Sequence, residues 1–115
     1  MRTADRPFSP APAGLTFERL SEINLDRCQG SFHVLDHWGV TDWACAAAGE
    51  MGEACNLIKK ARRGEDIPAS RIGEEIADTV IYLDLLAQRL GLRLGDEVRR
   101  KFDITSAKVG YNGKL

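Results

Sequence analysis

Apolar residues recur at intervals of three and four positions in four segments of the chain, and this spacing predicts amphipathic α-helices. The predicted helices cover about residues 16–30, 42–63, 68–90 and 94–109. At 115 residues the chain suits one domain, but it is short for an enzyme that must enclose a pocket by itself. We therefore expect an all-α fold, a four-helix bundle-type protomer that is completed by oligomerisation.

The first 14 residues differ from the rest of the chain. They contain Pro7, Pro10 and Pro12 and show almost no apolar periodicity. Such a composition is typical of a terminal segment without a packed structure of its own. We expect residues 1–14 to form a flexible arm and residues 15–115 to form the helical domain.

Residues typical of helix ends mark the boundaries of the predicted helices. Thr16 and Thr41 are the expected N-caps of the first two helices, because a threonine hydroxyl accepts a hydrogen bond from the first turn. Gly64 and Gly91 follow the second and third helices, at the position where glycine commonly ends a helix. The connection between these two helices is short, which makes them antiparallel neighbours.

Two pairs of carboxylates lie on the inward faces of these neighbours. Glu50 and Glu53 are three residues apart, as are Glu75 and Asp78, so each pair shares one side of its helix. The spacing alone is uninformative, because chance gives about two or three such pairs at this acidic content. The position is informative, since Glu50 shares its face with Trp43 and other apolar residues. A carboxylate in such surroundings needs a cation or a hydrogen-bonded base.

Few bases are available to compensate these charges. Glu50 and Glu53 have no Lys or Arg three or four positions away, whereas Arg71 lies one turn before Glu75 and offers an intrahelical ion pair as the alternative interpretation. We expect the four carboxylates to converge between the two helices and to hold a divalent cation. Ligation by oxygen alone favours Mg²⁺, with Mn²⁺ as a substitute. Di-iron bundles need Glu-x-x-His, which the sequence lacks.

The remaining faces of these two helices predict further packing. The second helix carries small residues opposite Glu50, so another helix can approach it closely there. These residues are Ala44, Cys45, Ala48, Gly52 and Cys55. The third helix is apolar nearly all round, which indicates a central position or a subunit interface.

The linker between the first two helices is rich in aromatic residues. Phe32, His33, His37 and Trp38 fall within seven residues, and Trp43 follows in the next helix. Two interpretations stay open: the segment plugs the core, or it forms a stacking platform for a flat ring such as a nucleobase. The two histidines lack the nearby thiolate or third histidine of a typical transition-metal site.

Charge along the chain narrows the choice of partners. Arg99 and Arg100 in the fourth helix are interpreted as a solvated face, whereas Lys101 and Lys108 lie nearly on one side and can reach phosphates held at the metal. The net charge is −1 and the two signs are mixed, so we expect no nucleic-acid partner and no membrane partner.

Cysteine usage and hydropathy predict the compartment. Cys28, Cys45 and Cys55 are odd in number and lack Cys-x-x-Cys spacing, so we expect reduced thiols. There is no signal-peptide-type run, and no stretch approaches the roughly 18 consecutive apolar residues of a membrane span. We expect a soluble, cytoplasmic protein.

Three segments of the sequence resemble one family. They read Gly-Glu-Met-Gly-Glu-Ala-Cys-Asn-Leu-Ile-Lys-Lys (49–60), Glu-Glu-Ile-Ala-Asp-Thr-Val-Ile-Tyr-Leu (74–83) and Arg-Arg-Lys-Phe-Asp-Ile-Thr-Ser-Ala-Lys-Val-Gly-Tyr (99–111). With these segments, the chain from about Thr16 to Leu115 resembles the MazG-like branch of the all-α nucleoside triphosphate pyrophosphohydrolases. It departs from that branch at Asp103, where Asn often follows Lys-Phe.

The resemblance implies an activity and its ligands. The reaction is Mg²⁺-dependent cleavage of a (d)NTP between its α and β phosphates, giving a (d)NMP and pyrophosphate. The implied assembly is a homodimer or homotetramer with sites at subunit interfaces. Glu50, Glu53, Glu75 and Asp78 are the implied metal ligands. One of the first pair, Glu53 in our interpretation, also orients or deprotonates the attacking water.

Substrate-binding roles follow from the resemblance together with the aromatic linker. Tyr82 lies where related enzymes place a residue near the sugar or base. The residues expected at the base and sugar are therefore Trp38, Trp43, His33 and Tyr82, and those expected at the phosphates are Lys60, Lys101 and Lys108.

The expected function is therefore a nucleotide pyrophosphohydrolase that removes unwanted nucleotides from the pool. One alternative is a non-catalytic helical module that binds a nucleotide or partner and keeps its carboxylates for structure. Another is a phosphoribosyl-ATP pyrophosphohydrolase, which shares the fold and the mechanism.

Overall fold

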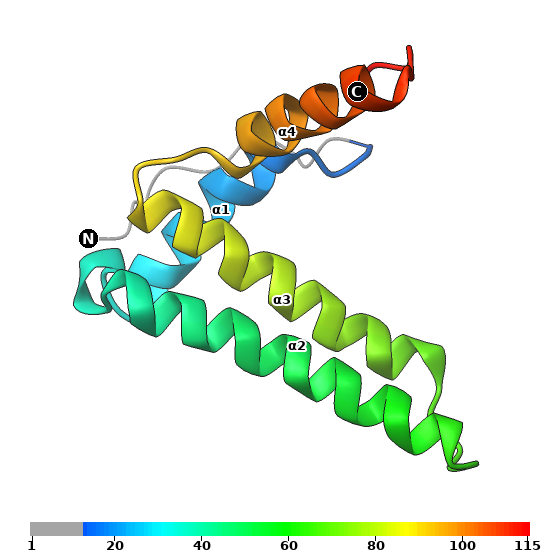
Figure 1. Cartoon of the computed structure of the whole chain (residues 1–115). Helices are drawn as coiled ribbons and strands as arrows, with labels where there is room; N and C mark the ends of the chain where they lie inside the picture. Colours follow the sequence, from blue (N-terminus) through cyan, green and yellow to red (C-terminus); the bar gives the residue numbers. More distant parts are fainter. Residues whose placement is uncertain (1–12) are drawn as a thin grey trace.

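The computed structural model describes residues 13–115, which fold into four α-helices and one short 3₁₀ turn (Figure 1). The elements are α1 (Phe17–Ser31), η1 (Leu35–His37), α2 (Val40–Arg62), α3 (Ala69–Arg89) and α4 (Leu94–Val109). The all-α prediction is confirmed. The predicted flexible arm falls on residues 1–14, of which 1–12 lie outside the described residues.

The predicted N-cap of the first helix is confirmed, whereas that of the second is wrong. Thr16 Oγ1 accepts a hydrogen bond from a backbone amide of the first turn at 3.0 Å. Helix α2 begins at Val40, two residues before the prediction. The reason is that Asp42 Oδ2 accepts from the Gly39 amide at 2.9 Å, which caps the helix from its third position. Thr41 therefore lies within the first turn.

Helices α2 and α3 end as the sequence predicts. Gly64 and Gly91 adopt φ values of 97° and 74°, a left-handed conformation that glycine reaches without a steric penalty. These turns stop the helical hydrogen bonding and redirect the chain.

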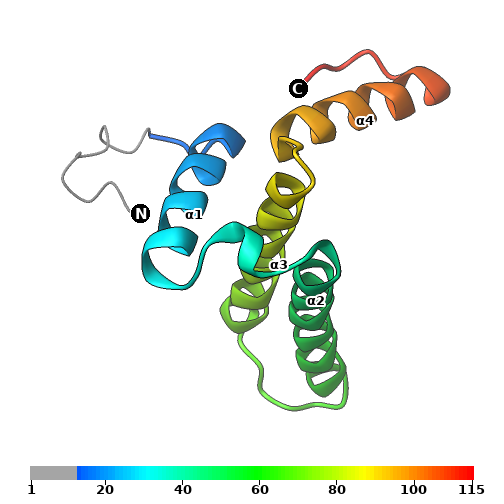
Figure 2. The same cartoon turned by 90° about the vertical axis from the view of Figure 1, so that its left-hand side faces the viewer.

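Helices α2 and α3 lie side by side as a long antiparallel hairpin (Figures 1 and 2). Residues 63–68 connect them at one end. Helix α1 packs against α3 near the other end, and α4 extends away from the hairpin (Figure 2). The contact between α1 and α4 requires glycine, because a Cβ at Gly95 would lie only 2.8 Å from the Cβ of Phe17.

The buried core lies where α1, η1, α2 and α3 meet. Cys28, Trp43 and Leu85 form its centre, with Trp38 and Tyr82 among the partly buried residues around them. Burial of a large apolar side chain contributes about 1.5–3 kcal/mol, so this cluster stabilises one end of the hairpin. The buried positions of α2 are Trp43, Ala47, Ala54 and Leu57, which confirms the predicted inward face.

Long faces of the hairpin stay uncovered within the chain. The prediction that another helix covers the small-residue face of α2 is wrong for a single chain, because Cys45, Ala48, Gly52 and Cys55 are exposed. On α3, exposed apolar side chains follow one stripe at Ile76, Val80 and Leu83. Within residues 13–115, no helix is both long and apolar enough to cross a membrane.

Candidate functional site

Three carboxylates meet across the seam between α2 and α3. Glu50 projects from α2, and Glu75 and Asp78 project from α3, one turn apart. Each offers an oxygen that lies within 4.8 Å of the other two. Glu50 and Glu75 are half-buried and Asp78 is exposed, so the trio sits at the edge of the packed seam.

The three carboxylates of this trio repel one another electrostatically. A hydrogen bond shared with Glu75, partial burial and the negative charges of Glu75, Asp78 and Glu53 raise the pKa of Glu50 above its usual value. The ion pair that Arg71 offers to Glu75 is not formed, and no Lys or Arg in residues 13–115 forms an ion pair with any of the three. Among the described residues, no base neutralises the charge of the trio.

Glu53 does not belong to the trio. It is exposed and lies outside the group of converging oxygens. Three residues of helix turn its side chain about 60° away from that of Glu50, toward solvent. The structure thus brings together three of the four carboxylates predicted from the sequence, although the charge of Glu53 still acts on Glu50.

A cavity of about 350 Å³ adjoins the trio at the core end of the hairpin. Its walls combine aromatic rings with two of the three carboxylates. The aromatic lining residues are Phe32, His33, Trp38, Trp43 and Tyr82, and the carboxylates are Glu50 and Asp78. A ligand with a flat ring at one end and a strongly anionic group at the other would match this arrangement once a cation joined the carboxylates.

The aromatic residues serve as core and as cavity wall at once. Trp43 is 2% exposed, and its ring centroid lies 4.7 Å from that of Trp38 and 6.1 Å from that of Tyr82. His33 lies 4.9 Å from Trp38, by ring centroids. Phe32 remains 72% exposed. Both interpretations of the aromatic linker are therefore compatible, because the side of the cluster facing the cavity is open.

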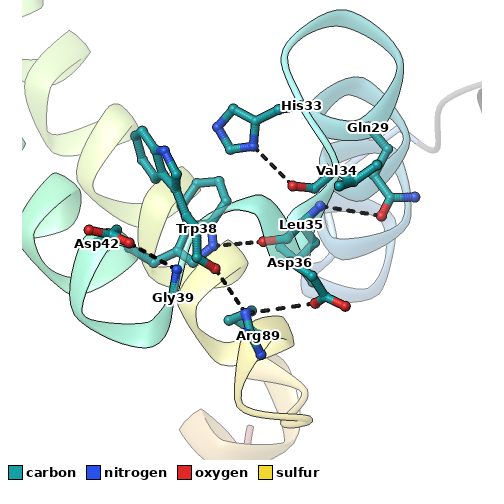
Figure 3. A network of polar contacts seen from close by, with 10 residues as sticks. Gln29, His33, Val34, Leu35, Asp36, Trp38, Gly39, Asp42 and Arg89 are labelled. Atoms are coloured by element: carbon teal, nitrogen blue, oxygen red, sulfur yellow. Dashed lines mark hydrogen bonds and ion pairs between the residues drawn. The ribbon is translucent and has the colours of Figure 1, made fainter.

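Hydrogen bonds to the backbone hold the aromatic linker in place (Figure 3). Trp43 Nε1 donates to the Leu35 carbonyl at 3.1 Å. Arg89 Nε on α3 donates to the Trp38 carbonyl at 2.9 Å and lies 3.7 Å from a carboxylate oxygen of Asp36. The linker is thus attached to α2 and α3, which fixes the wall of the cavity relative to the carboxylates.

The cations predicted to contact phosphate lie outside the cavity. Lys60, Lys101 and Lys108 are not among its lining residues, and the last two are exposed on α4. The cation that lines the cavity is Arg27, on the outer side of α1. Sequence reasoning missed Arg27, because a single exposed arginine in an amphipathic helix carries no distinguishing signal.

A second buried polar group attaches α1 to α3, and sequence reasoning missed it as well. Asp84 is fully buried and accepts hydrogen bonds from Ser21 Oγ, from Asn24 Nδ2 at 3.0 Å and from Gln88 Nε2 at 2.9 Å. The signal was present, since Asp84 is a lone acidic residue within the apolar run Tyr82 to Leu86. Gln88 lies one turn further along the same helix, but Ser21 and Asn24 lie on α1 and could not be identified from local spacing.

Comparisons with protein-family models, curated proteins and solved structures found no match to this chain. The functional argument therefore depends on the geometry and chemistry of the site.

Proposed function

We propose that the protein is a Mg²⁺-dependent nucleoside triphosphate pyrophosphohydrolase, which cleaves a (d)NTP to a (d)NMP and pyrophosphate and clears nucleotides from the cytoplasmic pool. One observation carries the proposal: Glu50 and Asp78 belong both to the carboxylate trio and to the wall of the aromatic cavity. A base stacked in the cavity would direct its phosphates toward the carboxylates.

The trio fits a small divalent ion. Mg²⁺ binds oxygen at about 2.0–2.1 Å, so two ligands on opposite sides of it lie about 4.2 Å apart. The oxygens of Glu50, Glu75 and Asp78 already lie within 4.8 Å of one another and have no competing base in the described part of the chain. Glu50, Glu75 and Asp78 would hold Mg²⁺ or Mn²⁺, and the ion would supply Lewis-acid chemistry that offsets phosphate charge.

The protein's own groups supply positioning and proton transfer in this proposal. In this proposal Trp38, His33 and Tyr82 stack against the base and sugar, which fixes the nucleotide relative to the carboxylates. Trp43, which we predicted at the base, is 2% exposed and supports Trp38 and Tyr82 from the core instead. Glu53 faces solvent one turn from Glu50, so it is placed to accept a proton from water that enters beside the trio. Arg27 at the cavity wall offsets negative charge of the phosphates.

A second copy of the chain completes the site in our proposal. The exposed stripe Ile76, Val80 and Leu83 leaves apolar surface on the same helix that carries Glu75 and Asp78. On α4, the Oδ1 atom of Asp103 is buried without a hydrogen-bond partner among residues 13–115. A homodimer or homotetramer would cover the stripe, and its lysines, Lys60, Lys101 and Lys108, would reach phosphates across the interface.

The test is pyrophosphate release from a panel of nucleoside triphosphates with Mg²⁺, repeated with a chelator. We expect metal-dependent release, and Glu50→Gln should lower kcat at least about 100-fold because it removes a charged ligand of the cation that offsets phosphate charge. Glu74→Gln is the matched control, since this exposed neighbour of Glu75 lies outside the trio. Nucleotide binding without any turnover would instead identify a non-catalytic binding module, and equal turnover in both variants would refute the assigned site.

A further inference from the structure

The buried part of the cavity wall offers hydrogen-bond acceptors and has no donor left over. Four lining residues are at least nine-tenths buried: Asn24, Cys28, Trp43 and Leu85. The Trp43 N–H is used by the Leu35 carbonyl. Burial raises the pKa of the Cys28 thiol, which stays protonated and donates to the His33 carbonyl, with Sγ and O 3.2 Å apart.

Asn24 is the residue that decides the polarity of this wall. It is 5% exposed, and its Nδ2 donates both hydrogens to α3, to the Ile81 carbonyl at 2.9 Å and to Asp84 Oδ2 at 3.0 Å. Its Oδ1 has no hydrogen-bond partner among the described residues. The side chain lines the cavity, so Oδ1 is the polar atom that Asn24 leaves for a ligand.

The orientation of this amide is fixed by its partners. Turning the carboxamide over would place Oδ1 against the Ile81 carbonyl and the Asp84 carboxylate, both of which are acceptors. Asp84 itself is held by Ser21 and Gln88, so it cannot turn away without breaking their hydrogen bonds. Donation to a carboxylate also polarises the amide and makes its oxygen a stronger acceptor.

His33 adds a second acceptor to the same wall. Its Nδ1 lies 3.0 Å from the Val34 carbonyl, which can only accept, so Nδ1 carries the hydrogen. In the neutral ring, Nε2 is then an acceptor. The other donors among the lining residues are the Arg27 guanidinium, the Trp38 indole N–H and the Tyr82 hydroxyl. Arg27 is exposed, and Trp38 and Tyr82 are half-buried like His33, so these donors lie outside the buried part of the wall.

We propose that Asn24, oriented by Asp84, selects a base that carries an exocyclic amino group over the keto base of the same shape, which has an oxygen in that place and a hydrogen on the adjacent ring nitrogen. The inference rests on the proposed nucleotide site and names its substrate class. An amino group donates to Asn24 Oδ1, whereas a keto oxygen in the same place sets lone pair against lone pair. Neither acceptor then has a partner, and sites built to hydrogen-bond a polar group discriminate strongly for this reason.

Isosteric nucleotide pairs test the inference without any need for turnover. Wild-type protein is titrated without metal with dCMP and dUMP, and separately with dAMP and dIMP, while the fluorescence of Trp38 and Trp43 is followed. We expect the amino member to bind at least about tenfold more tightly in one or both pairs. The pair with the tighter binding also shows which ring size the cavity takes. Equal binding within both pairs, a preference for the keto members, or no binding of any of the four would overturn the inference.

Two variants assign the preference to Asn24. Asn24→Leu should bring the ratio of dissociation constants within the discriminating pair to about one. Gln29→Leu is the matched control, since it makes the same amide-to-leucine change on α1 at a hydrogen-bonded side chain that lies outside the cavity and does not contact Asp84. It should keep the wild-type ratio, and circular dichroism checks that both variants are helical. A ratio that persists in Asn24→Leu, or is lost in Gln29→Leu, contradicts the role of Asn24.

The test separates this inference from the proposed function. Metal-dependent pyrophosphate release with no discrimination between amino and keto bases would refute the role of Asn24 and leave the hydrolase intact. Discrimination in binding with no release from any triphosphate would refute the hydrolase and leave the base-selective cavity.

Discussion

Helix α3 carries two aspartates, Asp78 and Asp84, about two turns apart, which differ both in burial and in their hydrogen-bond partners. Asp84 is fully buried but accepts hydrogen bonds from Ser21, Asn24 and Gln88. Asp78 is exposed and faces two further carboxylates, with no donor supplied by the described residues. Burial therefore does not distinguish the carboxylate that we propose as functional from the structural one. The two aspartates differ instead in their hydrogen-bond donors. A carboxylate that accepts a full set of hydrogen bonds from the chain needs no further partner.

The largest effect on stability is expected when the buried Asp84 is replaced. Asp84→Ala leaves the buried Asn24 amide without its strongest partner and removes the joint between α1 and α3, so we expect a loss of about 3 kcal/mol in the free energy of unfolding. Asp78→Ala in metal-free protein should cost less than about 0.5 kcal/mol. Urea denaturation measures both. Similar losses for the two variants would show that the aspartates have the same role.

A smaller effect on stability is expected when a divalent cation binds the carboxylate trio. Mg²⁺ or Mn²⁺ at about ten times its dissociation constant should stabilise wild-type protein by about 1.4 kcal/mol, because the ion binds only the folded chain. Glu50→Gln should raise the melting temperature of the metal-free protein and abolish the response to metal. The hydrogen bond with Glu75, partial burial and the neighbouring carboxylates raise the pKa of Glu50, and a glutamine can donate to Glu75 without carrying a charge. Differential scanning fluorimetry with and without a chelator measures this. A metal response that survives Glu50→Gln would place the ion elsewhere.

The smallest effect on stability is expected when the contacts that hold the aromatic wall of the cavity are removed. Arg89 donates a hydrogen bond of 2.9 Å to the Trp38 carbonyl. The ion pair between Arg89 and Asp36 is longer, at 3.7 Å, and the carboxylate of Asp36 is largely exposed. Arg89→Met should cost about 1 kcal/mol and loosen the cavity wall, which weakens nucleotide binding. Asp36→Ala should change stability by less than about 0.5 kcal/mol. Urea unfolding and tryptophan fluorescence compare the two, and a larger effect of Asp36→Ala would show that the ion pair holds the linker.

Much of the site was present in the spacing of residues along single helices. Trp43, Ala47, Glu50, Ala54 and Leu57 follow one another at intervals of four and three, so Glu50 occupies a seam position among buried residues. Glu53 does not fit this series, and its exposure was therefore readable from the sequence. We predicted four converging carboxylates because residues three apart lie on the same side of a helix, and this criterion did not distinguish Glu53 from Glu50. In the structure three carboxylates converge.

The sequence by itself determined the four helices, their approximate ends and the position of Glu50 among the buried residues of α2. These features depend on contacts within one or two helical turns, which local spacing encodes. Only the tertiary structure decided that Asp84 is satisfied, that Asn24 presents its oxygen to a cavity and that Arg27 lines it. The partners of these groups are 57 to 63 residues apart, as for Asn24 with Ile81 and Ser21 with Asp84, and their meeting depends on how α1 rotates and docks against α3. Periodicity shows which face of a helix turns inward, but it does not show which residue of another helix that face will meet.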